Sequence, residues 1–279
     1  MQIPSVDTIL RDALIEDIGH GDITTSSIVP PKHKSKAILI AKEDFILAGI
    51  PFAERVFKLV DRGIRFKADK KDGDRVKKGT VIATVSGNTR SLLMAERVAL
   101  NLVQRLSGIA TLTHRFVDCV NGFSVRIVDT RKTTPNLRFF ERYAVRIGGG
   151  YNHRFGLFDG VLIKDNHIVA AGGIERAVRL ARMNAPHMMK IEVEVRNSTE
   201  LEEALSAGAD IVMLDNMTLK EIKNAVRGIR QKRLQTTIEV SGNINMENVR
   251  EIAKAGVDLI SIGALTHSAP AVDISMEIF

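Results

Sequence analysis

The sequence predicts an α/β protein in which an α+β domain precedes a domain of parallel strands joined by helices. Two observations carry this prediction. From residue 125 onward, short apolar runs rich in β-branched residues alternate with segments of helical period, which is typical of buried parallel strands and their crossover helices. The first 110 residues instead combine a helical segment with alternating strand-like runs, which indicates antiparallel pairing.

The elements of the first part follow one another closely. Residues 6–17 have apolar side chains at helical spacing and predict a helix. The strand-like segments are 35–48, 63–69 and 72–88, the last of which reads as a β-hairpin. A long helix over roughly 89–106 leads out of this part. The alternating C-terminal segment 272–279 predicts a strand that returns to it.

The second part contains six predicted strands. They cover residues 125–130, 160–166, 190–195, 210–216, 236–242 and 258–263. Apolar residues at positions i, i+3, i+4 and i+7 predict helices between them. Two capping boxes are expected, Thr199 with Glu202 and Thr218 with Glu221. Strand then helix, repeated, produces parallel strands with right-handed crossovers, and both a barrel and a doubly wound sheet satisfy this pattern.

Composition limits the function classes. The formal net charge of +7 suggests an anionic partner. Aromatic residues make up only 5% of the chain and the lysines and arginines are dispersed, so we expect a small polyanionic substrate and no nucleic acid. The single cysteine excludes internal disulfides. The N-terminal stretch lacks a signal-peptide pattern and no apolar run approaches about 18 residues, so we expect no membrane association and a cytoplasmic protein.

Polar residues or glycines stand at the end of every predicted strand of the second part. The polar ones are Asp129, Arg131, Lys132, Lys164, Asp165, Asn166, Glu194, Asp215, Asn216 and Ser241, and the glycines are Gly242 and Gly263. In parallel α/β folds the carboxyl ends of the strands meet at one edge, where ligands bind. A single polar residue there usually caps a helix or faces water. Six successive strand ends instead predict a site for a polyanion together with a divalent metal.

Several longer stretches resemble one enzyme family over the whole chain. They are "DTRKTTPNLR", "YAVRIGGGYNHRFGLFDGVLIKDNHI", "IEVEV", "MLDN", "EVSGNI" and "DLISIGALTHSAPAVDIS", in this order. The chain is thereby similar to quinolinate phosphoribosyltransferases. The resemblance implies an N-terminal α+β sandwich domain at 1–107, joined by the C-terminal segment 268–279, and an incomplete, seven-stranded α/β (TIM-like) barrel at 108–267. Since six strands are predicted, the seventh is expected near 108–120 or was missed.

The resemblance also implies a reaction and a site. Phosphoribosyl pyrophosphate and quinolinate would give nicotinate mononucleotide, pyrophosphate and carbon dioxide, with Mg²⁺, in a homodimer or larger homo-oligomer. The cations that resemble the quinolinate and pyrophosphate wall are Arg131, Lys132, His153, Arg154 and Lys164, and Arg97 resembles an arginine that reaches in from the neighbouring subunit. Glu194 and Asp215 resemble the acids that hold the ribose hydroxyls and the metal, in part through substrate and water. The 5′-phosphate would bind at two turns, which contain Ser241, Gly242, Asn243 and Gly263, with His267 beside it.

Four of these residues are the expected catalytic set, namely Lys132, Lys164, Glu194 and Asp215. A wall of like charges within a few ångströms repels itself by about 1 kcal/mol per pair in water and by more in a partly dry cleft. We therefore expect anionic substrates to complete the wall.

Two asparagines stand where the family usually has glycine. They are Asn136 and Asn243. After glycine, asparagine is the residue that best tolerates a positive φ, so we expect the backbone geometry to be kept. The side chain of Asn243 could either crowd the phosphate or donate a hydrogen bond to it.

Three other functions are compatible with parts of this pattern. A related phosphoribosyltransferase acting on nicotinate or another ring acid would keep the phosphate turns but need fewer cations for carboxylates. A barrel lyase could form a Schiff base through Lys164 or Lys132. Nucleic-acid binding is the third, and its affinity would fall steeply with salt.

Overall fold

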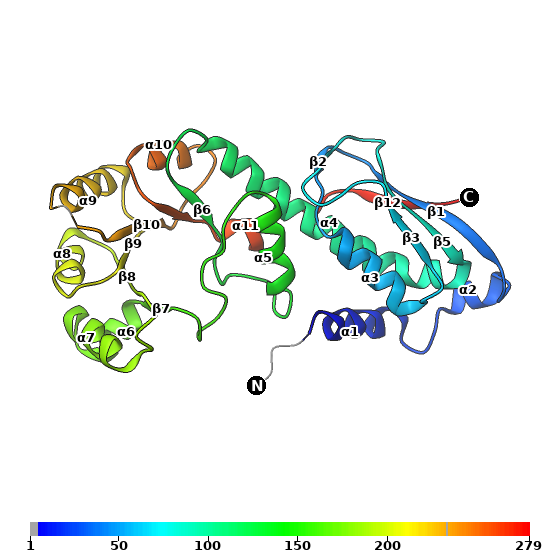
Figure 1. The fold of residues 1–279 in the computed structure, drawn as a ribbon, viewed down its shortest axis with the longest axis horizontal. Coiled ribbons are helices and arrows are strands. Elements are labelled where there is room, and N and C mark those ends of the chain that lie inside the picture. The colour runs from blue at the N-terminus through cyan, green and yellow to red at the C-terminus, as the bar shows by residue number, and fades with distance from the viewer. Residues whose placement is uncertain (1–4, 233) are drawn as a thin grey trace. The chain divides into compact units, whose positions relative to one another are not determined.

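The computed structural model describes residues 5–232 and 234–279 and divides into two compact units (Figure 1). One unit comprises the chain up to His114 together with Thr134–Gly149 and Ser268–Phe279. The other comprises Arg115–Thr133 and Gly150–His267. The division into domains at residues 107 and 267 stays a prediction.

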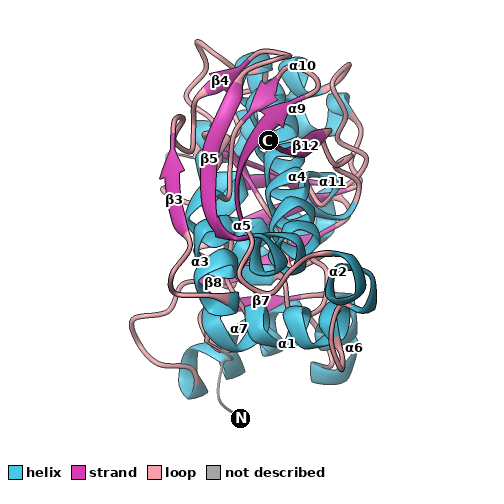
Figure 2. Cartoon of the chain, turned by 90° about the vertical axis from the view of Figure 1, so that its right-hand side faces the viewer, coloured by secondary structure: helices cyan, strands magenta, loops and turns pink. Residues whose placement is uncertain are grey.

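The first unit is built on an antiparallel sheet. Its strands are β1 (Lys34–Ala41), β2 (Phe45–Ile46), β3 (Arg65–Ala68), β4 (Arg75–Val76), β5 (Val81–Asn88) and β12 (Ile274–Ile278). Its helices are α1 (Val6–Ile18), α2 (Ile23–Ile28), α3 (Ile50–Val60), most of α4 (Thr89–Cys119) and α5 (Arg138–Ile147). The main sheet has the order β12-β1-β5-β3, and Figure 2 shows β3 beside β5. Because β12 pairs with β1, the predicted return of the C-terminal strand is confirmed.

The predicted hairpin at 72–88 is wrong. Its two strands exist, but β4 pairs with β2, and β5 pairs with β1 and β3. A turn does form, since the N–H of Thr80 donates to the carbonyl of Lys77 at 3.0 Å. β4 is only 2 residues long, whereas β5 has 8. The long strand therefore gains far more ladder hydrogen bonds with β1 than it could with β4.

Helix α4 extends well beyond the predicted end at 106, since it runs for 31 residues to Cys119. Residues 108–119 are therefore helical, and the expectation of a barrel strand there is wrong. Gly108 looks like a helix breaker in sequence, but it has a packing role. A Cβ at this position would overlap the carbonyl oxygen of Pro270 in the C-terminal segment.

Helix α5 belongs to the first unit because its contacts lie there. The ring of Phe140 packs edge-on against Phe52 of α3 at 4.8 Å, and the Tyr143 hydroxyl donates to Asp72 at 2.8 Å. The fully buried Glu141 accepts from Arg105 at 2.9 Å and from the N–H of Thr134 at 3.0 Å. These partners offset the cost of burying the Glu141 carboxylate.

The second unit contains a parallel sheet of 6 strands in the order β6-β11-β10-β9-β8-β7. The strands are β6 (Arg126–Val128), β7 (Val161–Ile163), β8 (Ile191–Val195), β9 (Ile211–Asp215), β10 (Thr237–Ser241) and β11 (Leu259–Ser261). Each lies inside one of the six predicted strands. The helices are α6 (Asp165–Ala171), α7 (Ile174–Asn184), α8 (Ser198–Ser206), α9 (Leu219–Gln231), α10 (Val249–Lys254) and α11 (Ala264–His267).

The strand order decides between the two parallel architectures. From β7 to β11 each strand pairs with the next one in sequence, as in an α/β barrel, with the helices outside the curved sheet in Figure 1. Beyond β6, Tyr151 forms a single parallel bridge with Val128. This bridge occupies the position of a seventh strand that the sequence pattern missed. Among the described residues nothing pairs with the outer edge of β7, so the barrel stays open there.

One of the two predicted capping boxes is confirmed. At the start of α9, Glu221 accepts from the N–H of Thr218 at 2.8 Å, and the Thr218 hydroxyl accepts from the N–H of Glu221. The other box is wrong, because Asn197 caps α8 by accepting from the N–H of Glu200 at 2.9 Å. Asparagine is at least as good a helix cap as threonine, and Asn197 precedes Thr199 in the chain, so the helix begins directly after Asn197. None of the helices in the described part of the chain combines the length and apolar character needed to cross a bilayer.

Candidate active site

A cavity of about 680 Å³ opens at the carboxyl ends of the parallel strands in the second unit. Its lining includes all the residues assigned to substrate, metal or catalysis except Arg97, namely Arg131, Lys132, His153, Arg154, Lys164, Glu194, Asp215, Ser241, Gly242, Asn243, Gly263 and His267. Three other predicted strand-end residues, Asp129, Asp165 and Asn166, do not line it. The predicted convergence of strand ends is therefore observed. The chemical roles assigned to these side chains stay predictions.

Arg97 lies elsewhere, in α4 of the first unit. Its side chain is 57% exposed, and its guanidinium is 3.4 Å from the carboxylate of Glu96. It does not line the cavity of the second unit.

Two basic side chains of the cavity, Lys164 and His153, have acidic partners within the unit. Lys164, after β7, binds the Glu194 carboxylate of β8 at 2.7 Å. Lys164 is 44% exposed and Glu194 only 12% exposed. Acids of the chain itself therefore already balance part of the positive charge of the wall. The expectation that anionic substrates complete the wall stays a prediction. Such a pair could still open to let the lysine meet an anion.

Arg154 and Arg131 are close enough to influence one another. Burial first, and then the positive charge of Arg131, lower the pKa of Arg154. One guanidinium nitrogen of Arg154 donates to the carbonyl of Gly160 at 2.9 Å. Gly160 directly precedes β7. Two neighbouring guanidinium groups form a site for a planar anion such as a carboxylate.

Lys132 and His267 meet at Gly263. A Cβ on Gly263 would lie 3.0 Å from Cδ of Lys132 and 3.1 Å from Nε2 of His267. The buried Thr266 hydroxyl donates to the carbonyl of Lys132 at 2.8 Å, which holds the lysine backbone against the start of α11. The turn after β11 thus needs glycine so that the side chains of Lys132 and His267 can both pack beside its backbone.

The turn after β10 has the backbone expected for its asparagine. Gly242 has a φ of 85° and Asn243 a φ of 52°. Asn136, the other asparagine at an expected glycine position, has a φ of 65°. The prediction that both asparagines keep a glycine-like conformation is confirmed.

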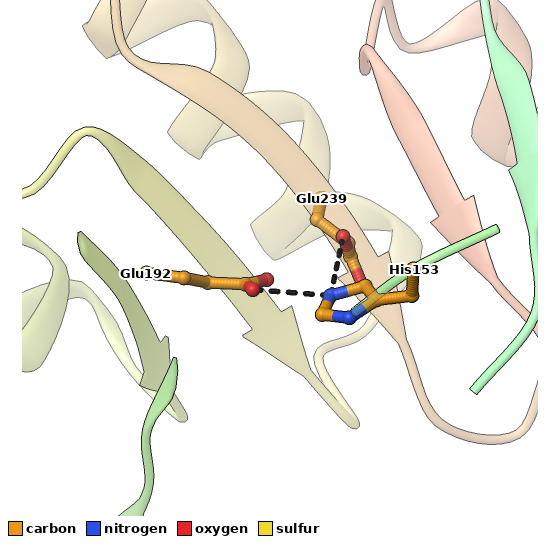
Figure 3. Close-up of side chains that lie close together, drawn as sticks. All are labelled: His153, Glu192 and Glu239. Atoms are coloured by element: carbon orange, nitrogen blue, oxygen red, sulfur yellow. Dashed lines mark ion pairs between the residues drawn. The ribbon is translucent and has the colours of Figure 1, made fainter. Parts of the chain in front are cut away.

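Sequence reasoning missed a cluster of buried groups, shown in Figure 3. The Nε2 atom of His153 lies 3.1 Å from Glu192 and 3.6 Å from Glu239. Glu239 is fully buried and also lines the cavity. Neither Glu239 oxygen has a hydrogen-bond partner among the described residues.

A simple signal could have revealed this cluster. Side chains two residues apart on a strand point to the same face. Glu192 therefore faces the same way as Glu194, and Glu239 the same way as Ser241. The missed acids lie one layer deeper in the sheet than the residues at the strand ends.

The cluster has an uneven charge count, with two carboxylates for one imidazole. Burial first, and then the charge of Glu192, raise the pKa of Glu239 to about 8. For His153 burial opposes the charged form, but the hydrogen bond to Glu192 and the two negative charges raise its pKa. The N–H of Arg154 donates to Nδ1 of His153 at 2.8 Å, and the other ring nitrogen, Nε2, faces Glu192.

Two groups of carboxylates could contribute to binding a divalent cation. In the first group, His153, Glu192 and Glu239 offer ligand atoms within 4.8 Å of one another, but the two glutamates are buried and already contact His153. Glu194 and Asp215 line the open cavity, and each has one oxygen already bonded, to Lys164 and to Asn216. Carboxylates of this kind fit Mg²⁺, which keeps several water or substrate oxygens in its shell.

Comparison with known proteins agrees with this geometry. The model for the C-terminal domain of quinolinate phosphoribosyl transferase matches residues 109–277, and the model for its N-terminal domain matches residues 22–107. The chain is 46% identical over 273 residues to a protein of Synechocystis described as a probable nicotinate-nucleotide pyrophosphorylase (carboxylating), covering 98% of this chain and 92% of the relative. A Bacillus subtilis protein of the same description is 46% identical over 270 residues, covering 97% and 92%.

Solved structures give the same result. The crystal structure of NadC from Streptococcus pyogenes is similar with a TM-score of 0.93 at 45% identity, covering 98% of this chain and 96% of that one. The nicotinate-nucleotide pyrophosphorylase of Francisella tularensis matches with a TM-score of 0.92 at 43% identity, covering 98% and 96%. With both domains matched and nearly half of the residues identical, the chain belongs to the quinolinate phosphoribosyltransferase family.

Proposed function

We propose that this protein transfers the phosphoribosyl group of phosphoribosyl pyrophosphate to quinolinate and releases pyrophosphate and carbon dioxide, giving nicotinate mononucleotide for NAD biosynthesis. One observation carries the proposal. A single cavity gathers arginines, lysines, histidines and three acids at the carboxyl ends of the strands, in a chain that belongs to this family. Its charge suits a dicarboxylate and a phosphorylated sugar.

The cations near β6 and β7 are the proposed quinolinate site. Arg131 and Arg154 present planar forks that can each bind a carboxylate through two hydrogen bonds, and Lys164 adds a point charge. When a substrate carboxylate arrives, it competes with Glu194 for Lys164. His153 is held by its acidic partners and supports the backbone of Arg154.

The turns after β10 and β11 are the proposed phosphate site. Gly242 and Gly263 let an anion approach backbone N–H groups closely. Lys132 flanks the second turn and supplies positive charge there, and His267 adds a ring nitrogen beside it.

The acids are proposed to act on the sugar. As pyrophosphate leaves C1 of the ribose with the bonding electron pair, positive charge develops at that carbon. Glu194 and Asp215 stabilise this charge, while Lys132 and the other cations stabilise the departing oxygens. Mg²⁺ bound with the diphosphate would neutralise further negative charge, and Glu194 and Asp215 would hold it together with substrate and water oxygens.

The quinolinate nitrogen then forms the new bond to C1 and becomes positively charged. The carboxylate on the adjacent carbon leaves as carbon dioxide, and its electron pair stays on the ring carbon, where the neighbouring N⁺ stabilises it until a proton arrives. A cation bound to that carboxylate favours the ground state over the transition state. The cavity cations are therefore proposed to orient quinolinate, and the ring itself to supply the stabilisation for decarboxylation.

We also propose that the active assembly is a homodimer or a larger homo-oligomer, with Arg97 contributed from one chain to the cavity of another. Its exposed side chain on α4 supports this.

The test is product formation from phosphoribosyl pyrophosphate with quinolinate or with nicotinate, following carbon dioxide and pyrophosphate together. We expect equal amounts of both products with quinolinate and neither with nicotinate. Turnover of nicotinate without gas release would identify a related transferase and overturn the proposal.

A further inference from the structure

Two asparagines connect the phosphate turn to one of the proposed catalytic acids. The side-chain N–H of Asn243 donates to Oδ1 of Asn216 at 3.0 Å. The amide nitrogen of Asn216 donates in turn to the Asp215 carboxylate at 2.8 Å. All three residues line the cavity.

The backbone holds these groups in place. The N–H of Asn216 donates to the carbonyl of Ser241 at 3.0 Å, which joins the ends of β9 and β10. The amide of Asn248 donates to the carbonyl of Asn243 at 2.8 Å. A Cβ on Gly242 would overlap the side chain of Asn216, so only glycine lets the two turns approach this closely.

The chemistry of an amide makes this chain directional. Asn216 has one oxygen and one NH₂ group, which point in opposite directions. If its amide were flipped, its NH₂ would face the NH₂ of Asn243 and its oxygen would face the Asp215 carboxylate. Both contacts would then be repulsive. Asn243 therefore adds to the preference for the orientation in which the NH₂ group of Asn216 reaches Asp215.

We propose that Asn243 is a positioning residue that orients the Asp215 carboxylate through Asn216. The proposal rests on the proposed function, because the orientation of Asp215 affects substrate binding only if Asp215 contacts the ribose. The side chain of Asn243 thus donates to a neighbouring turn of its own chain. A glycine at 243 would leave the Asn216 amide without this constraint.

The substitution Asn243→Gly tests the proposal with little disturbance of the backbone. Asn243 already has a φ of 52°, a conformation that glycine adopts readily. A hydrogen bond between exposed side chains is a modest interaction, so we expect a rise of about two- to tenfold in both the KM for phosphoribosyl pyrophosphate and its Kd measured by calorimetry. The KM for quinolinate should change much less.

Two further variants make the result specific. Asn136→Gly introduces the same change at another positive-φ asparagine that does not line the cavity, and it should keep wild-type constants. In an Asn216→Ala background, Asn243→Gly should have no additional effect, because the connection is already broken.

Each outcome is informative. An unchanged or lower KM and Kd for phosphoribosyl pyrophosphate in Asn243→Gly, or effects that add to those of Asn216→Ala, would overturn the inference. Wild-type protein that does not turn over quinolinate would instead overturn the proposed function, and the binding measurement would still test the positioning role.

Discussion

At the residue scale, the cavity is a balance of charges rather than a purely basic surface. Lys164 is paired with Glu194, and His153 with Glu192. These acids are largely shielded from water, whereas the cations reach the cavity. The protein can therefore keep a positive surface without a substrate, because the opposite charge lies directly behind it.

Replacing Glu239 by glutamine should change how stability depends on pH. The carboxyl pKa of Glu239 is raised from 4.5 to about 8 in the folded protein, first by burial and then by Glu192. The folded state thus holds a proton that the unfolded chain releases. The resulting stability is complete below a pH of about 4.5 and is lost as the pH rises to about 8, at about 1.4 kcal/mol per pKa unit. Glutamine resembles the protonated carboxyl and cannot lose that proton.

The measurement is the free energy of unfolding in urea from about pH 5 to about pH 9. The Glu239→Gln curve should rise relative to wild type as the pH increases, because only the wild type loses stability through Glu239. Glu247→Gln, at an exposed position, is the control and should run parallel to wild type. Parallel curves for Glu239→Gln would show that Glu239 is ionised at neutral pH.

At the element scale, the sequence predicted the kinds of element better than their partners. All six parallel strands were located, because near-continuous β-branched runs identify strands that are buried on both faces. The pairing of β4 and β5 was wrong, since alternation is equally compatible with a hairpin and with two different sheets. The bridge at Tyr151 is a single residue pair, which leaves no periodic pattern to recognise.

Gly108→Ala should destabilise the first unit, although alanine normally favours a helix. A Cβ at 108 overlaps the backbone of Pro270, which cannot move aside as a flexible side chain could. The C-terminal segment is also held to α4 by hydrogen bonds from Val272 to Gln104 at 3.1 Å and from Gln104 to Ile274 at 2.8 Å. We expect a loss of about 1–3 kcal/mol in the free energy of unfolding, the usual cost of overpacking.

A second glycine provides the control for this prediction. Gly228 lies in α9, and a Cβ there would meet no atom within 4 Å. Gly228→Ala should therefore stabilise the protein by up to about 1 kcal/mol through helix propensity alone. Urea unfolding of both variants checks the opposite signs. A stabilised Gly108→Ala would mean that the C-terminal segment does not pack as closely as described.

At the scale of the whole molecule, the sequence located a site but not its assembly. Most of the cavity residues stand at strand ends, and one rule about parallel sheets was enough to group them. His153, Arg154 and His267 were predicted only through the resemblance to the family. Whether one chain makes a complete site depends on surfaces that have no periodic signature. Arg97 shows the difficulty, because an exposed arginine on a helix looks the same whether it meets solvent or another subunit.

Mixing two inactive variants tests whether sites are shared between chains. Arg97→Ala lacks the proposed contribution to a neighbour, and Lys132→Ala lacks a residue of the cavity itself. In a mixed dimer one site combines an intact cavity with an intact Arg97, while the other site loses both. Random pairing of equal amounts of two chains makes half of the dimers mixed, so about a quarter of the wild-type activity should return.

The experiment needs subunit exchange, by co-expression or by unfolding and refolding the two variants together. The control mixes Arg97→Ala with a chain that carries both substitutions. No chain in that mixture has Arg97, so no site can be completed and activity should stay absent. Activity that fails to return in the first mixture, although mixed dimers are recovered through two different affinity tags, would mean that each chain uses its own Arg97.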